Sequence, residues 1–135
     1  MKILIIGCGK VGSRLARDLS GRGHAITVID NDPLAFERLG SSFKGTTMVG
    51  VGFDHDVLVK AGIERADAVA TVTESDEANV VAAKIAKQVF HVPRVAARVY
   101  DPRKADIYRR LGIQTISPVV LGASRLAALL VFSHL

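Results

Sequence analysis

The hydrophobic residues of this 135-residue chain fall into short unbroken runs, and stretches with helical spacing separate the runs. The runs are rich in Val, Ile, Leu and Ala, which is typical of strands that are buried on both faces of a parallel sheet. Between the first two runs, Val11, Leu15 and Leu19 recur at the spacing of one helix face. Six runs predict strands, at residues 2–6, 25–30, 46–51, 67–72, 94–99 and 113–116.

Helix starts are marked by prolines. Asp32-Pro33, Asp101-Pro102 and Ser117-Pro118 each place a capping side chain directly before a proline at the first helical position. The alternation of strands and helices predicts a single α/β domain over residues 1–135. We expect a Rossmann-like, doubly wound parallel sheet of six strands in the order 3-2-1-4-5-6, with right-handed crossovers. Ligands of such sheets bind beyond the C-terminal ends of the strands, where the strand order reverses.

The loop after the first predicted strand is glycine-rich. Gly7 permits a tight turn out of the strand, Gly9 lets a pyrophosphate approach the backbone, and Gly12 lets the following helix pack near the sheet. The helix N-terminus would then offer N–H groups and a partial positive charge to the phosphates. The full segment reads Gly7-Cys8-Gly9-Lys10-Val11-Gly12.

Asp30 closes the second predicted strand, at the offset that a dinucleotide-binding βαβ unit needs, and would accept hydrogen bonds from the ribose hydroxyls. Asn31 and Asp32 follow, without an arginine to receive a 2′-phosphate, so the pattern favours NAD(H), or ATP/ADP, over NADP. A P-loop is excluded because Ser13-Arg14 stand where Lys-Ser or Lys-Thr is required.

Some residues of this segment have a plainer interpretation. Asp32 fits a helix cap better than a ligand contact. Lys10 fits a phosphate contact and a solvated first helical turn equally well. Cys8 is the only cysteine, which excludes an intrachain disulfide and favours a reducing compartment. We interpret Cys8 as a small residue tolerated in the turn rather than a redox sensor.

The formal net charge of +5 does not indicate a nucleic-acid site, because no aromatic residues are interleaved with the basic ones. Solvated helix faces explain the charge, and a weak attraction to an anionic membrane surface stays open. No apolar stretch approaches the roughly 20 residues that cross a bilayer.

Several loops, taken in order, resemble those of the regulatory domains of potassium transport that are known as TrkA-N, KTN or RCK domains. Besides the glycine loop and Val28-Ile29-Asp30-Asn31-Asp32, they are Gly52-Phe53-Asp54, Ala66-Asp67-Ala68-Val69, Thr71-Val72-Thr73-Glu74-Ser75-Asp76-Glu77-Ala78-Asn79 and Ala97-Arg98-Val99. The resemblance covers essentially the whole chain. It implies a cytoplasmic subunit, peripheral on the inner face of the membrane, that binds NAD(H) or ATP/ADP and gates a potassium transporter or channel.

The resemblance also implies a set of nucleotide-binding residues. Asp30 would hold the ribose, Asp54 or its neighbours would lie near the adenine, Thr73 would lie near the phosphates or the nicotinamide, and Arg98 would reach toward the nucleotide. The third loop departs from the family's common Gly-Asp by one residue. The full predicted set is Gly7, Cys8, Gly9, Lys10, Val11, Gly12, Asp30, Asn31, Asp32, Gly52, Phe53, Asp54, Thr73, Glu74 and Arg98.

Structural interpretations stand beside several of these roles. Asp54 could equally cap a helix that begins at His55, and Thr73 and Asp76 are spaced like a capping box. Asn79 fits an exposed or loop-bonding residue better than a ligand. Arg98 lies in a strand that we expect to be buried, so it needs an acidic or phosphate partner.

Catalytic chemistry finds no support in the sequence. The four histidines are scattered, and we find no metal-ligand spacing, nucleophile elbow or paired carboxylates. We therefore predict a binding domain with no catalytic residues and no metal. The alternative is a cofactor-binding fragment of an NAD-dependent oxidoreductase.

The last predicted helix is apolar nearly all round, which indicates that it is buried. We expect one half of the segment 117–135 to cover the sheet and the other half to contact another subunit, as a dimerisation or crossover helix. This predicts a symmetric homodimer, and the family resemblance implies a larger ring. Its apolar residues are Val119, Val120, Leu121, Leu126, Leu129, Leu130, Val131, Phe132 and Leu135.

Overall fold

The six predicted strands form one parallel sheet in the computed structural model, which describes residues 1–132. The strand order is β3-β2-β1-β4-β5-β6, as the sequence predicts. The observed bounds agree with the predicted ones to within two residues. The strands are β1 (Lys2–Ile6), β2 (Ala25–Asp30), β3 (Thr46–Val49), β4 (Ala68–Thr71), β5 (Arg94–Arg98) and β6 (Gln114–Ile116).

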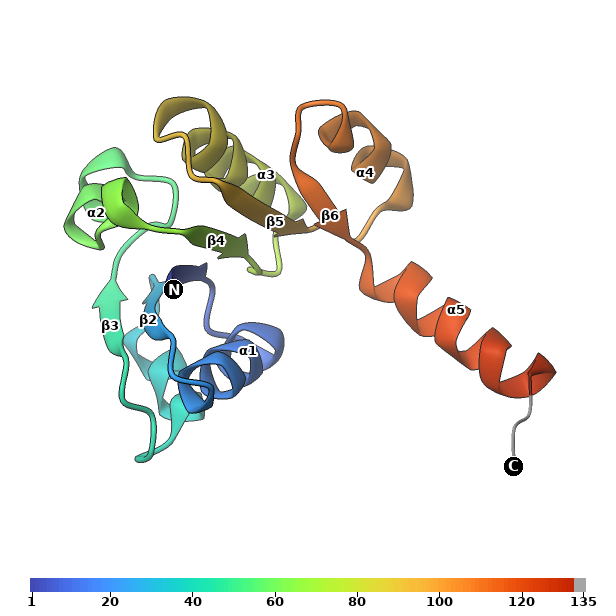
Figure 1. Cartoon of the computed structure of the whole chain (residues 1–135), viewed down its shortest axis with the longest axis horizontal. Helices are drawn as coiled ribbons and strands as arrows, with labels where there is room; N and C mark the ends of the chain where they lie inside the picture. The colour runs from blue at the N-terminus through green and yellow to red at the C-terminus, as the bar shows by residue number, and fades with distance from the viewer. Residues whose placement is uncertain (133–135) are drawn as a thin grey trace.

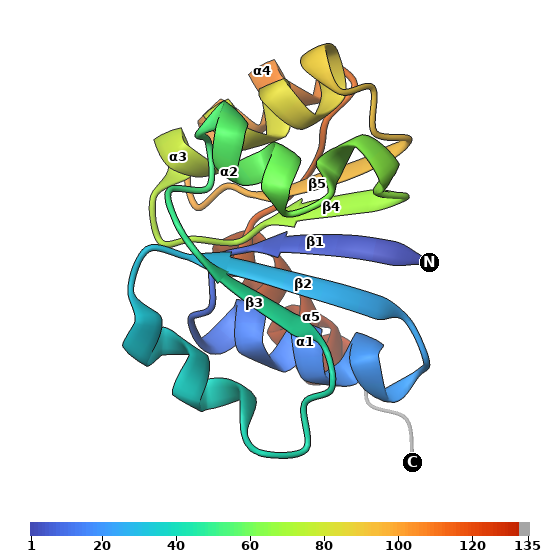
Figure 2. The ribbon, with the colours of Figure 1, turned by 90° about the vertical axis from the view of Figure 1, so that its left-hand side faces the viewer.

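Helices cover both faces of the sheet, as Figure 2 shows with the sheet nearly edge-on. One face carries α1 (Lys10–Gly21) and the 3-10 helix η1 (Pro33–Leu39). The other face carries α2 (His55–Lys60), α3 (Asp76–Lys84) and α4 (Pro102–Arg109). The π-helical turn η3 (Ile85–Val89) extends α3, and the short 3-10 helix η2 (Ile63–Arg65) follows α2.

Alternation along the central strand divides the core in two. Successive side chains of a strand point to opposite faces, so Ile3 and Ile5 pack with α1 and η1, while Leu4 and Ile6 pack on the other side. The side chain of Ile5 is fully buried. Because both faces are covered, β1 reads as a continuous apolar run rather than as an alternating one.

The three predicted proline caps are confirmed. Asp32 accepts a hydrogen bond from the backbone N–H of Leu34 at 3.0 Å, and η1 follows it. Asp101 accepts from Arg103 at 3.0 Å before α4. Ser117 accepts from Val120 at 3.4 Å before α5 (Pro118–Val131).

The expectation that half of the last helix covers the sheet is wrong. Helix α5 leaves the sheet at its β6 edge and extends away from the domain (Figure 1), and none of its residues is buried. A helix that follows an edge strand can turn back over the sheet or continue outward, and α5 continues outward, which leaves Ala96 of β5 exposed. Leu130 is 83% exposed, and the rest of the predicted segment, residues 133–135, lies outside the described residues. Among those described, no helix has the length and apolar character needed to span a membrane.

Candidate functional site

A cleft of about 810 Å³ opens at the C-terminal ends of the strands. It lies where the order reverses between β1 and β4, and the loops after β1, β2, β3, β4 and β5 all contribute to its walls. Its volume is in the range of clefts that hold small ligands. Of the predicted site residues, only Gly12 and Asp54 do not line it.

The three glycines of the loop after β1 have distinct tasks. Gly7 has a φ of 111°, and a Cβ there would lie 2.8 Å from the backbone nitrogen of Thr73. A Cβ on Gly12 would overlap the carbonyl oxygen of Gly7, so close packing of α1 against the loop requires glycine. Nothing lies within 4 Å of a Cβ built on Gly9, which lines the cleft. The space above Gly9 is therefore free for a ligand.

Gly9 is also the N-cap of α1, and no side chain caps this helix. The first turn of α1 contains no acidic residue. The N–H groups at this end therefore keep their partial positive charge toward the cleft, which favours an anion. Lys10 follows on the cleft wall and adds a formal positive charge.

Asp30, the last residue of β2, connects two loops. Its Oδ2 accepts a hydrogen bond from the backbone N–H of Cys8 at 2.8 Å, and its Oδ1 accepts from Asp32 at 2.9 Å. A carboxylate offers about four acceptor positions. Two are used here, so Asp30 keeps acceptor capacity on the cleft wall for a donor such as a ribose hydroxyl.

Arg98 reaches the cleft from the end of β5 with an unsatisfied donor. Its Nε is buried and has no hydrogen-bond partner in the described residues, and none of their carboxylates forms an ion pair with it. Its guanidinium carbon lies 4.6 Å from the centre of the Tyr100 ring. A buried donor without a partner is energetically costly. The sequence predicted an acidic or a phosphate partner for Arg98, and residues 1–132 provide no acidic one.

Asn79 connects the ends of β4 and β5. Its Oδ1 accepts from the backbone N–H and the hydroxyl of Thr73, at 2.8 and 2.6 Å. Its Nδ2 donates to the carbonyls of Thr73 and Arg98, both at 2.9 Å. The side chain is fully buried, so loop bonding is confirmed and exposure is wrong. Asn79 lies on the face of α3 that meets the sheet.

The predicted capping box of Thr73 and Asp76 is wrong. The N-cap of α3 is Ser75, whose hydroxyl accepts from the backbone N–H of Ala78 at 3.1 Å. Thr73 instead accepts from the N–H of Ser75 at 3.2 Å, one turn before the helix. Asp76 contacts the backbone of a different loop. The sequence offers several polar residues here, and their spacing alone does not select the cap.

In the third loop, Asp54 caps α2 by accepting hydrogen bonds from the backbone N–H groups of Asp56 and Val57, at 2.9 and 3.2 Å. The structural interpretation of Asp54 is therefore confirmed, and this residue lies outside the cleft lining. Its neighbours Gly52 and Phe53 do line the cleft.

Among the cleft-lining residues that sequence reasoning missed are a charged one, Arg38, and an aromatic one, Tyr100. Arg38 comes from η1, and its guanidinium donates to the carbonyl of Cys8 at 3.5 Å. No arginine directly follows Asp30 in the sequence, and Arg38 reaches the cleft because η1 turns it back toward Cys8. Tyr100 lies two residues after Arg98, where the end of a strand gives a weak signal.

The Cys8 thiol is fully buried, and its Sγ donates to the carbonyl of Ala35 at 3.4 Å. Burial raises the pKa of this thiol, and the nearby Asp30 carboxylate raises it further, while Arg38 acts in the opposite direction. A raised pKa keeps the thiol neutral and unreactive. The geometry therefore supports Cys8 as a packed turn residue.

Comparison with known sequences identifies a family. The profile of the TrkA-N domain matches residues 3–118. The chain is 54% identical over 119 residues to the Trk system potassium uptake protein TrkA of Streptomyces coelicolor, and this match covers 88% of the chain and 53% of that protein. It is 36% identical over 102 residues to TrkA of Vibrio alginolyticus, covering 76% of the chain and 22% of that protein. The chain thus spans about half the length of the first relative and less of the second.

Solved structures share the fold. The Kef C-terminal domain of Shewanella denitrificans in an AMP-bound form has a TM-score of 0.81 at 22% identity, covering 99% of this chain and 83% of that one. GsuK bound to ADP has a TM-score of 0.81 at 23% identity, covering 98% and 34%. The GsuK channel bound to NAD has a TM-score of 0.72 at 23% identity, covering 87% and 21%.

The structural likeness establishes the fold, and the sequence comparisons establish the relationship. The profile match spans most of the chain and includes the glycine loop, Asp30 and Arg98. The chain belongs to the TrkA-N domain family.

Proposed function

We propose that this chain is a nucleotide-binding regulatory domain of a potassium uptake system, and that NAD(H) or ATP/ADP occupies the cleft. The observation that carries the proposal is the state of Arg98, a residue of the cleft wall whose buried Nε has no partner in the described residues. A phosphate oxygen in the cleft would accept a charge-assisted hydrogen bond from this guanidinium, and a small turn of the side chain toward it would also satisfy the Nε donor.

The ligand would span the cleft between its two ends. Its diphosphate would rest on the N-terminus of α1 above Gly9, within reach of Arg98 and Lys10, and Asp30 would accept from its adenosine ribose. Gly52 and Phe53 on the third loop would border the adenine. Structural neighbours bound to AMP, ADP and NAD have the same fold, which supports an adenine nucleotide as the class of ligand.

We propose two kinds of partner, a membrane protein suggested by the relatives and a second copy of the chain suggested by α5. The S. coelicolor and V. alginolyticus relatives are potassium uptake proteins, so we assign this chain a place on the cytoplasmic side of a membrane potassium transporter or channel. Helix α5 would join two copies in a homodimer, or in a larger ring, because its large apolar side chains are exposed within the described residues.

The mechanism is differential binding rather than catalysis. Two ligands of the same cleft, such as NADH and NAD or ATP and ADP, would favour different arrangements of the paired copies, and the membrane protein would follow. Shifting an equilibrium from 1:99 to 99:1 takes about 5.5 kcal/mol of differential affinity, which two or more coupled copies can share.

Thermal denaturation with NAD, NADH, NADPH, ATP and ADP tests the ligand, because stabilisation follows the ratio of concentration to Kd. Rubidium uptake by cells that lack the chain, restored with the wild type or with Asp30→Ala, tests the function. We expect the wild type alone to restore regulated uptake. If Asp30→Ala restores regulated uptake as well as the wild type does, the nucleotide does not regulate transport, and the proposal fails.

A further inference from the structure

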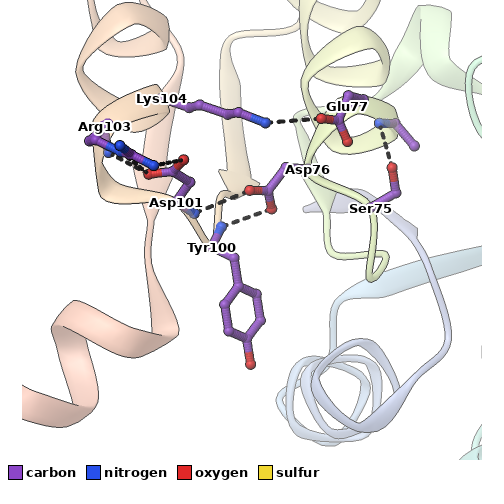
Figure 3. Close-up of polar contacts among 8 residues, drawn as sticks. Ser75, Asp76, Glu77, Tyr100, Asp101, Arg103 and Lys104 are labelled. Atoms are coloured by element: carbon purple, nitrogen blue, oxygen red, sulfur yellow. Dashed lines mark hydrogen bonds and ion pairs between the residues drawn. The ribbon is translucent and has the colours of Figure 1, made fainter.

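Asp76, the first residue of α3, does not line the cleft, yet it connects α3 to the turn after β5. Its Oδ1 accepts from the backbone N–H of Tyr100 at 2.8 Å, and its Oδ2 accepts from Asp101 at 3.1 Å. Figure 3 shows both oxygens facing these consecutive N–H groups, while the Tyr100 ring points away from the contact. One carboxylate thus fixes the backbone of a turn that is 24 and 25 residues distant in sequence.

The turn needs this contact because the strand pairing ends before it. The last bond to β6 is the N–H of Val99 with the carbonyl of Ile116. Beyond that point the Tyr100 carbonyl accepts from the Ser117 hydroxyl at 3.2 Å. The two N–H groups that follow Val99 are held by Asp76. The backbone of Tyr100 is therefore held at its N–H by Asp76 and at its carbonyl by Ser117.

Tyr100 in turn sets the direction of Arg98. Its ring lies 4.6 Å from the guanidinium carbon of Arg98, and both side chains line the cleft. The Nε of Arg98 makes no hydrogen bond in the described residues. The aromatic face is thus a main constraint on the guanidinium in the absence of a ligand. Displacement of Tyr100 would release Arg98 from its aim into the cleft.

From this geometry we infer that Asp76 is a positioning residue of the nucleotide site, which acts by holding Tyr100 and through it orients Arg98 toward the ligand's phosphates. The inference rests on the function proposed above. It assigns a task to a carboxylate that touches no ligand. Pre-positioned donors bind more tightly because less ordering remains to be done on binding.

Glu77, the next residue of α3, provides a matched control. Its Oε1 accepts from the Lys104 ammonium at 2.9 Å, and its side chain makes no hydrogen bond to the turn backbone among the described residues. Glu77→Gln removes a carboxylate from the same helical turn and leaves Tyr100 held. Asp76→Asn replaces one acceptor oxygen by a donor that cannot bind an N–H group.

The test is a double-mutant cycle on ADP affinity with Asp76→Asn, Arg98→Ala and the two combined. We expect Asp76→Asn to weaken ADP binding about tenfold in the wild-type background and to have no further effect once Arg98 is alanine. Glu77→Gln should bind ADP as the wild type does. Equal weakening in both backgrounds, or no weakening, overturns the inference. If Asp76→Asn unfolds at the working temperature, Asp76→Ser, whose hydroxyl can serve the turn only in part, takes its place in the cycle.

A second readout needs no nucleotide and therefore separates this inference from the function on which it rests. In the ligand-free wild type, NMR should show a slowly exchanging Nε–H for Arg98, because that group is buried. We expect Asp76→Asn to make this proton exchange fast and Glu77→Gln to leave it slow. An unchanged signal in Asp76→Asn contradicts the inference even if ADP binds. Absence of binding of ADP, ATP, NAD and NADH to the wild type contradicts the proposed function instead.

Discussion

The carboxylate of Asp30 accepts a hydrogen bond from the backbone N–H of Cys8 at 2.8 Å, which joins the end of β2 to the loop after β1. A glycine-rich loop has few side chains of its own to hold it, so its shape depends on such contacts from neighbouring strands. Asp30 therefore supports the loop proposed for the phosphates and also presents an acceptor for the ribose. The two halves of the proposed site are linked through this one side chain.

Substitution by alanine should affect ADP binding at one glycine of that loop and stability at another. Gly9→Ala meets no atom within 4 Å, so we expect its free energy of unfolding to stay within about 1 kcal/mol of wild type while ADP affinity falls. Gly12→Ala would overlap the Gly7 carbonyl, and we expect it to lose about 1–3 kcal/mol of stability. Urea denaturation and ADP titration measure both effects. Unchanged ADP affinity in Gly9→Ala would show that no ligand approaches this backbone.

Arg98→Met should separate stability from binding. The substitution removes a buried donor without a partner in the described residues, so the ligand-free melting temperature should hold or rise. Affinity for ADP should fall at least about tenfold, because a charge-assisted bond to phosphate is lost. Arg94→Met, at the exposed opposite end of β5, is the control and should bind normally. A clear fall in the ligand-free melting temperature of Arg98→Met would mean that Arg98 serves the fold instead.

The buried thiol of Cys8 should make stability depend on pH in the alkaline range. Its pKa is raised in the folded chain, mainly by burial. Below the ordinary thiol pKa both states keep the proton; between the ordinary and the raised pKa only the folded state keeps it, so the free energy of unfolding falls as pH rises. Urea denaturation at neutral pH and at about pH 10 should show a smaller fall for Cys8→Ala than for wild type. An equal decrease in the free energy of unfolding for both proteins would indicate that the thiol is in contact with water.

Helix α5 should control the oligomeric state. Leu126 and Leu130 are 62% and 83% exposed, so replacing both with glutamate should cost the single copy little stability. We expect light scattering to show a dimer or larger assembly for wild type and a monomer for the double variant. Val81→Glu, at a 44% exposed apolar position of α3, should leave the assembly intact. A monomeric wild type at high concentration would contradict the role proposed for α5.

The sequence predicted the strands because parallel strands covered on both faces are continuous apolar runs. Their order followed from the alternation of strands and helices with right-handed crossovers. The glycine loop and Asp30 could also be predicted from the sequence. The loop requires glycine at fixed positions, and the ribose site requires a carboxylate at the end of the second strand. Three helix caps could be predicted because a proline follows each of them, namely Asp32, Asp101 and Ser117.

The errors have a common physical source. The direction of α5 depends on where the sheet ends, and its apolar composition says nothing about that. The reach of Arg38 into the cleft depends on the 3-10 geometry of η1, and the choice of Ser75 over Thr73 as a cap depends on loop shape. The contacts of Asp76 and Asn79 join residues far apart in sequence. Such tertiary contacts leave no local pattern.

The most direct test of the nucleotide site is calorimetric titration of ADP into the wild type, Asp30→Ala and Asp67→Ala. Asp67 offers a matched control, because its carboxylate also accepts a backbone N–H at 2.8 Å, from Lys2, before the start of β4 and away from the cleft. We predict saturable binding of one ADP per chain to the wild type and to Asp67→Ala, and at least about tenfold weaker binding to Asp30→Ala. Equal affinity for Asp30→Ala and wild type would contradict the nucleotide site, and so would a wild type that shows no saturable binding of ADP or, in the same titration, of ATP, NAD or NADH.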